Sequence, residues 1–121
     1  MMQRIDGLWT VEGISLDTAT SAGVLVLCCG QVVGGGERYY CVGSYKAKRA
    51  IVEIDVKFYH YHGAVHSPVA GARPDFQIRF RGRVLTELIE GNARCADGAV
   101  SVPFRLVWRA PLEAYQSQVL G

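Results

Sequence analysis

The sequence predicts an all-β protein, a small antiparallel up-and-down β-barrel of about seven to eight strands. Apolar and polar residues alternate along much of the chain, as they do in strands with one buried face. No stretch of a dozen residues has a helical repeat of apolar positions. Short turn-forming segments separate the alternating stretches, as in β-hairpins. Hairpins without covering helices hide their edges by closing into a barrel or by pairing as a sandwich, and we favour the barrel.

The clearest strand runs from Ala50 to His62. Val52 and Ile54 fall on its apolar face, whereas Glu53 and Asp55 fall on the polar face. The other strands are expected from the same alternation or from β-branched and aromatic residues. In chain order, they are Gly7 to Leu16, Ala22 to Cys29, Gln31 to Val33, Tyr39 to Lys46, Phe76 to Arg81, Val84 to Arg94 and Val100 to Arg109.

Glycine and proline predict the interruptions between and within these strands. Hairpin turns are expected at Gly30-Gln31, Ala47-Lys48, Gly82-Arg83 and Asp97-Gly98. The run Gly34-Gly35-Gly36 predicts a sharp bend or bulge after a short strand. Pro103 predicts an edge position or a bulge in the last strand, because proline cannot donate a hydrogen bond to the ladder.

The length of the chain fits one domain. Its 121 residues lie within the usual size of a single domain and leave no room for a second core. We therefore expect one barrel domain over residues 1–121, with a tail that frays after about residue 110.

The charge balance argues against a dedicated nucleic-acid binder. The chain has 13 basic and 11 acidic residues and a formal net charge of +2, far below the basic excess that phosphate neutralisation requires. Arg79, Arg81 and Arg83 project from one side of a strand. We interpret them as solvated, because no aromatic stacking residues are interleaved with them on that side of the strand. Direct nucleic-acid binding is not expected.

No sequence feature indicates a membrane or an export signal. The N-terminus lacks an apolar stretch behind a basic start. The longest apolar run, Ala22 to Cys29, is much too short to cross a bilayer. We expect a soluble, cytoplasmic protein.

The cysteines are expected to be reduced thiols. The chain contains Cys28, Cys29, Cys41 and Cys95, without the Cys-x-x-Cys spacing of a zinc site or a redox centre. In an extended strand, Cys28 and Cys29 would project to opposite faces and could not easily bond to each other.

The histidines are the weak candidates for a metal site. His60 and His62 are expected to share one face of a strand near a barrel mouth, close to His66. No carboxylate or thiolate has the spacing to complete a ligand set. We therefore favour hydrogen-bonded histidines at the rim, and expect no metal or other cofactor. Glu53 and Asp55 are interpreted as solvated charges, so we expect no enzyme activity.

Several short motifs occur in a characteristic order. They are Asp6-Gly7-Leu8-Trp9, Gly23-Val24, Gly30, Gly34-Gly35-Gly36, Tyr39-Tyr40, Gly43-x-Tyr45 and Tyr59-His60-Tyr61-His62. Their order and spacing, over roughly residues 5 to 110, resemble the GrlR-like negative regulators of bacterial type III secretion. The resemblance implies a lipocalin-like barrel that forms a homodimer and sequesters a partner transcription activator. A lipocalin-like barrel also implies an alternative, a carrier of a small apolar ligand in the barrel interior.

One segment departs from the family pattern. GrlR-like regulators carry an acidic run in a hairpin loop that is associated with partner binding, whereas the matching turn here is Lys46-Ala47-Lys48-Arg49. Because charge complementarity selects partners, the reversed sign implies a different partner or a relocated contact. We predict Lys46, Lys48 and Arg49 as partner-binding residues. The simpler alternative is an exposed, solvated turn.

Overall fold

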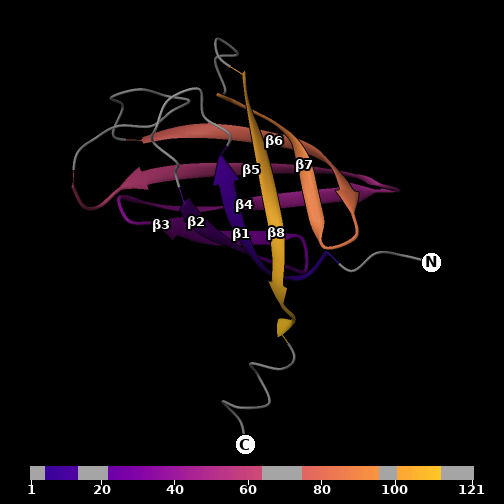
Figure 1. Cartoon of the computed structure of the whole chain (residues 1–121). Coiled ribbons are helices and arrows are strands. Elements are labelled where there is room, and N and C mark those ends of the chain that lie inside the picture. The colour runs from indigo at the N-terminus through magenta and orange to yellow at the C-terminus, as the bar shows by residue number, and fades with distance from the viewer. Residues whose placement is uncertain (1–4, 14–21, 64–74, 96–100, 113–121) are drawn as a thin grey trace, which may run out of the picture.

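A computed structural model shows that the described residues form eight antiparallel strands closed into a barrel (Figure 1). The structure describes residues 5–13, 22–63, 75–95 and 101–112. The strands are β1 (Gly7–Gly13), β2 (Ala22–Cys28), β3 (Gln31–Gly36), β4 (Tyr39–Lys48), β5 (Ile51–His60), β6 (Asp75–Leu85), β7 (Leu88–Cys95) and β8 (Ser101–Ala110). Each strand pairs with the next, and β8 pairs with β1. The predicted up-and-down barrel is confirmed.

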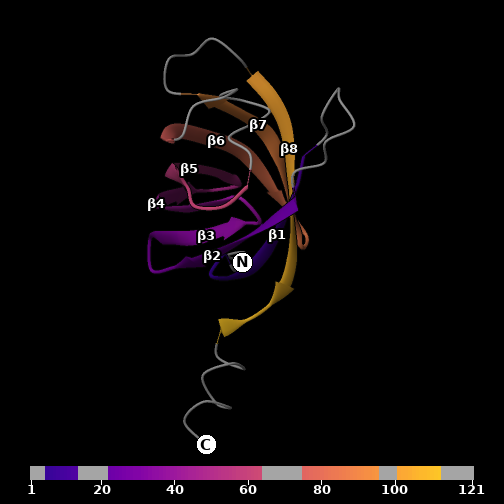
Figure 2. The same cartoon turned by 90° about the vertical axis from the view of Figure 1, so that its left-hand side faces the viewer.

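The two ends of the barrel differ in their connections. Three hairpins, β2–β3, β4–β5 and β6–β7, have two-residue turns at one end, which we name the tight-turn end. Each turn has a non-glycine residue with left-handed backbone, Cys29 (φ 54°), Arg49 (φ 59°) or Glu87 (φ 60°), and in the first turn Gly30 (φ 83°) is left-handed as well. The β3–β4 turn, the end of β5 and the start of β6 lie at the other end, which we name the loop end. Figure 2 shows how the sheet curls until β8 lies beside β1.

The structure corrects three predicted turns. The β2–β3 turn is Cys29-Gly30 and the β4–β5 turn is Arg49-Ala50, so Gly30-Gln31 and Ala47-Lys48 are each displaced. The predicted turn at Gly82-Arg83 is wrong, because β6 continues to Leu85 and turns at Thr86-Glu87. The predicted turn at Asp97-Gly98 lies outside the described residues.

Gly82 lies inside β6 because it allows a close approach of the neighbouring strand. A Cβ atom at this position would lie 2.9 Å from both the Glu90 carbonyl oxygen and Ile89 Cγ2. Burial alternates without interruption along the whole of β6. The glycine therefore provides space between β6 and β7 rather than a change of direction.

The predicted interruption at Gly34-Gly35-Gly36 is also wrong. β3 continues through all three glycines to Gly36, and a Cβ atom at Gly34 would lie 2.1 Å from the Val24 carbonyl oxygen. Pro103 pairs with Asn92 on β7 without a register shift, so the bulge alternative is wrong there. The edge position stays a prediction, because the described pairing of β8 with β1 ends at Phe104. The register shift between β1 and β8 occurs instead at Leu8 and Trp9.

The inward side chains pack into one core. They come from alternate positions of every strand, as the two-residue period requires. The largest fully buried side chains are Trp9, Leu25, Leu27, Ile54, Ile89 and Leu106. Edge-to-face ring pairs add to this packing, with centroids 4.9 Å apart for Phe80 and Phe104 and 5.4 Å apart for Trp9 and Trp108. None of the described residues belongs to a helix with the length and apolar character needed to span a bilayer.

The buried thiol of Cys41 makes the stability of the barrel sensitive to alkaline pH. Cys41 is 1% exposed, and burial raises the pKa of its thiol from 9.0 to about 12. Between these values the unfolded thiol ionises while the folded thiol keeps its proton. The contribution of Cys41 to the free energy of unfolding is therefore complete below pH 9 and falls by up to about 1.4 kcal/mol per pH unit above it.

We expect wild-type protein to lose about 2 kcal/mol more stability than Cys41→Ala between pH 8 and about pH 10.5. Urea unfolding of both proteins at the two pH values measures this difference, because other titrating groups contribute equally to both. An equal loss in the two proteins would contradict the prediction.

Candidate functional site

The outside of the barrel divides into an apolar half and a charged half. The apolar half covers β2, β3 and the first part of β4. We name this patch the apolar face and define it as Val24, Val26, Val33, Tyr40 and Val42. Four of these side chains are 41% to 49% exposed, and Val26 is partly buried. This face was not predicted, although apolar residues at both odd and even positions of β2 signalled it.

The strand register places the members of the apolar face side by side. Val26 on β2 is directly opposite Val33 on β3, which in turn is directly opposite Val42 on β4. Leu8 on β1 extends this row, because it is opposite Val26. The outward positions of β2, β3 and residues 40–44 of β4 carry no charged side chain among the described residues. Contiguous exposed apolar surface of this kind marks interaction sites.

Tyrosines extend the apolar face towards the loop end. The rings of Tyr40 and Tyr59 stack with centroids 5.3 Å apart, and the Tyr61 ring lies 6.1 Å from Tyr40. The Tyr61 hydroxyl donates a hydrogen bond to the Gly36 carbonyl oxygen. Tyr61 is thereby held against the end of β3 while 55% of it remains exposed.

The other half of the barrel, over β5 to β8, carries paired charges. The register sets Glu53 opposite Arg81 and Asp55 opposite Arg79. The ion pairs on this half and its border with β1 are Arg79–Asp55 (3.2 Å), Arg81–Glu53 (2.8 Å), Arg105–Glu90 (3.3 Å), Arg105–Glu12 (4.0 Å) and Arg109–Glu12 (3.9 Å). The row of arginines is exposed as expected, but carboxylates on neighbouring strands offset its charge.

No family model matches this chain. No curated protein matches it either. The resemblance to the GrlR-like regulators stays a prediction that rests on the order of short motifs in the sequence.

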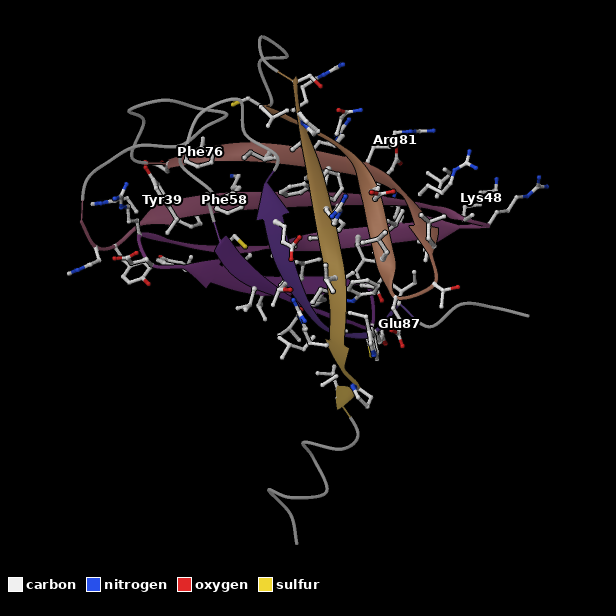
Figure 3. The ribbon with its side chains drawn as sticks, in the orientation of Figure 1. Tyr39, Lys48, Phe58, Phe76, Arg81 and Glu87 are labelled. Carbon is white, nitrogen blue, oxygen red and sulfur yellow. The ribbon has the colours of Figure 1, made fainter. Side chains whose placement is uncertain are left out.

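The predicted partner-binding residues lie at the tight-turn end. Lys46 and Lys48 belong to the last part of β4, Arg49 is the first residue of the turn, and all three side chains are exposed. Figure 3 shows Lys48 at the tip of the β4–β5 hairpin. Glu53 lies opposite Lys46, yet its carboxylate is 2.8 Å from Arg81. We name Lys46, Lys48 and Arg49 the basic tip.

The predicted pairing of His60 and His62 on one face is wrong. β5 ends at His60, so the strand alternation does not continue to His62. His60 Nε2 lies 2.7 Å from the Gly63 carbonyl oxygen, and its ring packs 5.4 Å from Tyr39. Neither histidine belongs to a group of three possible metal ligands among the described residues. His66 lies outside the described residues.

Aromatic rings gather inside the barrel towards the loop end. The ring centroid of Phe76 lies 5.2 Å from that of Tyr39, edge to face, and 5.2 Å from that of Phe58, in a stacked arrangement. Figure 3 shows these three residues at the end of the barrel opposite Lys48. Tyr39 and Phe76 are buried. The rings therefore pack against one another in this part of the interior.

Cys28 and Cys29 lie together rather than on opposite faces. Cys28 ends β2, whereas Cys29 is the left-handed residue of the following turn. Their sulfur atoms are 3.6 Å apart, and the Cys28 thiol donates to Cys29 Sγ. This contact, with a smaller effect of burial, raises the pKa of Cys28. The sequence prediction was wrong because it treated both residues as extended strand.

Asp6 lies beside the two thiols at the tight-turn end. Its carboxylate oxygens accept hydrogen bonds from the Tyr45 hydroxyl and from the Cys29 backbone N–H, the latter at 3.2 Å. Burial and the hydrogen bond to Asp6 raise the pKa of Tyr45 to about 12. The Tyr45 hydroxyl therefore keeps its proton and acts as a donor at neutral pH.

Proposed function

We propose that the protein is a non-catalytic cytoplasmic regulator that acts by binding other proteins through the outside of its barrel. The observation that carries this proposal is the division of the outer surface into an uncharged apolar face and an ion-paired half. A second copy of the chain is the occupant that we assign to the apolar face. The motif resemblance adds the finer proposal, that the regulator represses type III secretion genes by sequestering a transcription activator.

The chemistry of the apolar face favours a symmetric homodimer. A two-fold interface uses the same patch on both subunits, so each contact occurs twice and the patch must complement itself. Rows of valine do so without any charge, whereas a charged face would meet its own sign across a central two-fold axis. The cores of homodimer interfaces are also more apolar than the surface as a whole.

The basic tip is the contact that we assign to the activator. It lies at the end of the β4–β5 hairpin, beyond the apolar face, so a dimer formed through that face leaves it accessible. Its three positive side chains favour an acidic partner surface. In the motif resemblance, the segment that holds Lys46, Lys48 and Arg49 matches the contact loop of the GrlR-like regulators in place, though not in charge.

We expect Val33→Glu, Val42→Glu to separate the dimer into monomers. The two substitutions place carboxylates in the dimer interface, where those of one subunit face those of the other. We expect the dimer dissociation constant to rise about 100-fold or more. Light scattering coupled to gel filtration measures the mass, with Gln77→Glu on the charged half as the matched control. A monomeric wild-type protein, or a variant that stays dimeric, would contradict the proposed interface.

Purification from the native host tests the regulatory role, because it identifies the protein that stays bound to the regulator. Lys48→Glu, Arg49→Glu is expected to stay dimeric and to lose a transcription activator that wild-type protein retains. If the activator remains bound to this variant, the basic tip is not the contact. If wild-type protein retains no activator, the proposal of sequestration fails.

The alternative function is a carrier of a small apolar ligand. Its support is the aromatic cluster of Tyr39, Phe58 and Phe76 inside the barrel, since apolar ligands bind between such rings. The large buried side chains elsewhere in the interior favour the regulator over the carrier. Native mass spectrometry separates the two, because a carrier retains a small molecule through purification.

A further inference from the structure

Three donor atoms for a soft metal ion lie together at the tight-turn end. They are a carboxylate oxygen of Asp6 and the sulfur atoms of Cys28 and Cys29, and all three lie within 4.8 Å of one another. The two sulfurs are 3.6 Å apart. Two thiolates bound to one tetrahedral Zn²⁺ ion, each at about 2.3 Å, lie about 3.8 Å apart. The spacing of the thiols is thus already that of a chelating pair.

The backbone holds these donors in place. Gly7 pairs with Leu27, so Asp6, which immediately precedes β1, lies next to Cys28, the last residue of β2. The left-handed conformation of Cys29 turns its side chain back towards Cys28 instead of across the sheet. The Cys29 N–H also donates to Asp6. The site is therefore built from the start of β1 and the β2–β3 turn.

Tyr45 on β4 supports the site from a third segment. Its backbone N–H donates to the Gly30 carbonyl oxygen at 2.9 Å, which fixes the turn that carries Cys29. Its hydroxyl donates to Asp6 Oδ1. A carboxylate has about four lone-pair positions, so these hydrogen bonds orient Asp6 and leave lone pairs for a cation. Tyr45 is a positioning residue for the site.

We propose that Asp6, Cys28 and Cys29 bind one thiophilic divalent cation, for which Zn²⁺ is the borderline and Cd²⁺ the softer example. Two thiolates select soft and borderline ions over Mg²⁺ and Ca²⁺, which prefer oxygen ligands. Shifts of about 1 Å in the side chains bring all three donors to bonding distance. Three protein donors leave the fourth tetrahedral position to water.

The bound ion would join the segment before β1 to the β2–β3 turn. Metal binding to the folded state raises stability by mass action. The sequence lacks Cys-x-x-Cys spacing. The site is instead the pair Cys28 and Cys29, brought together by the left-handed turn at Cys29 and completed by Asp6 from the segment before β1. This site is independent of the proposed dimer and of the basic tip.

Titration of reduced protein with CdCl₂ under anaerobic conditions tests the site. We expect thiolate-to-cadmium charge-transfer absorption that saturates at one ion per chain, and native mass spectrometry should show the same stoichiometry. ZnCl₂ is expected to displace Cd²⁺ only in excess, because zinc is the less thiophilic ion. Absence of the absorption with excess Cd²⁺, or one ion shared by two chains, would overturn the proposal.

Cys29→Asn is the most informative variant. Asn-Gly is the preferred pair for a two-residue turn with left-handed residues, so Cys29→Asn should preserve or raise the stability of the metal-free protein. It removes one thiolate, and we expect Cd²⁺ affinity to fall about 100-fold or more. Cys28→Ser is expected to give a similar loss from the neighbouring position. Normal affinity in both variants would overturn the site.

Controls separate this site from the other thiols and test the role of Tyr45. The double variant Cys41→Ala, Cys95→Ala removes the buried thiols and is expected to keep one Cd²⁺ per chain. Tyr45→Phe keeps all three ligands and should weaken binding about tenfold, as loss of a hydrogen bond to a ligand does. Loss of the charge-transfer signal in the Cys41, Cys95 double variant while the barrel stays folded would also overturn the assignment.

Discussion

Gly91→Ala is expected to lower the free energy of unfolding by about 3 kcal/mol, a large part of the roughly 5–15 kcal/mol of a domain of this size. Gly91 on β7 lies directly opposite Gly82 on β6. A Cβ atom at Gly91 would lie 1.9 Å from the Arg81 carbonyl oxygen and 2.5 Å from Gly82 Cα. Both are backbone atoms, which cannot rotate aside as a side chain can. The two strands must separate, and the ladder between them is weakened.

Asn92→Ala is the matched control for this change. Asn92 is the next residue on β7 and is exposed, so its replacement should change stability by no more than about 0.5 kcal/mol. Urea unfolding followed by circular dichroism measures both variants. A Gly91→Ala protein as stable as the control would show that β6 and β7 can separate at this point without cost.

Trp9→Ala is expected to lower the free energy of unfolding by about 4 kcal/mol. Trp9 is 1% exposed and packs edge-to-face on Trp108 with ring centroids 5.4 Å apart. Its indole N–H donates to the Ile5 carbonyl oxygen at 2.9 Å. The substitution leaves a cavity where β1 meets β8 and also releases the segment that precedes β1.

Two further variants separate the contribution of the buried ring from that of the hydrogen bond to Ile5. Trp9→Phe keeps most of the ring volume and loses the hydrogen bond to Ile5, so its expected cost is about 1–2 kcal/mol. Leu85→Ala removes a large apolar side chain from the outside of β6, where it is 39% exposed, and should cost less than about 1 kcal/mol. Urea unfolding of Trp9→Ala, Trp9→Phe and Leu85→Ala ranks the three losses of stability. Equal losses for Trp9→Ala and Leu85→Ala would contradict the burial argument.

The strands were predictable where one face is buried and the other is wet. In β5 and β6 the alternation identified the inward side chains correctly, including Val52, Ile54 and Phe80. The turns were less predictable, because the sequence argument relied on glycine. Gly30 does take a left-handed turn position, but so do the non-glycine residues Cys29, Arg49 and Glu87, and Gly82 serves close packing within a strand.

The two candidate sites were not predictable from local pattern. The apolar face needs Val26, Val33 and Val42 from three strands to align, which depends on the register between them. The thiol site needs the left-handed turn residue Cys29 and the approach of Asp6 from the segment before β1. The basic tip, in contrast, is contiguous in the sequence, so its residues were identified before its position in the barrel was known.

Local periodicity by itself determined that this chain forms a sheet and which side chains fill the interior of its clearest strands. That the sheet closes as a barrel rather than packing as a sandwich was decided by the pairing of β8 with β1. Tertiary structure decided which residues of different strands meet. It paired the arginines of β6 with carboxylates of β5, aligned valines on the outside and brought two thiols to a carboxylate. The physical reason is that a two-residue period assigns each side chain to a face, whereas the register that selects its neighbours is set by turns and by closure of the whole barrel.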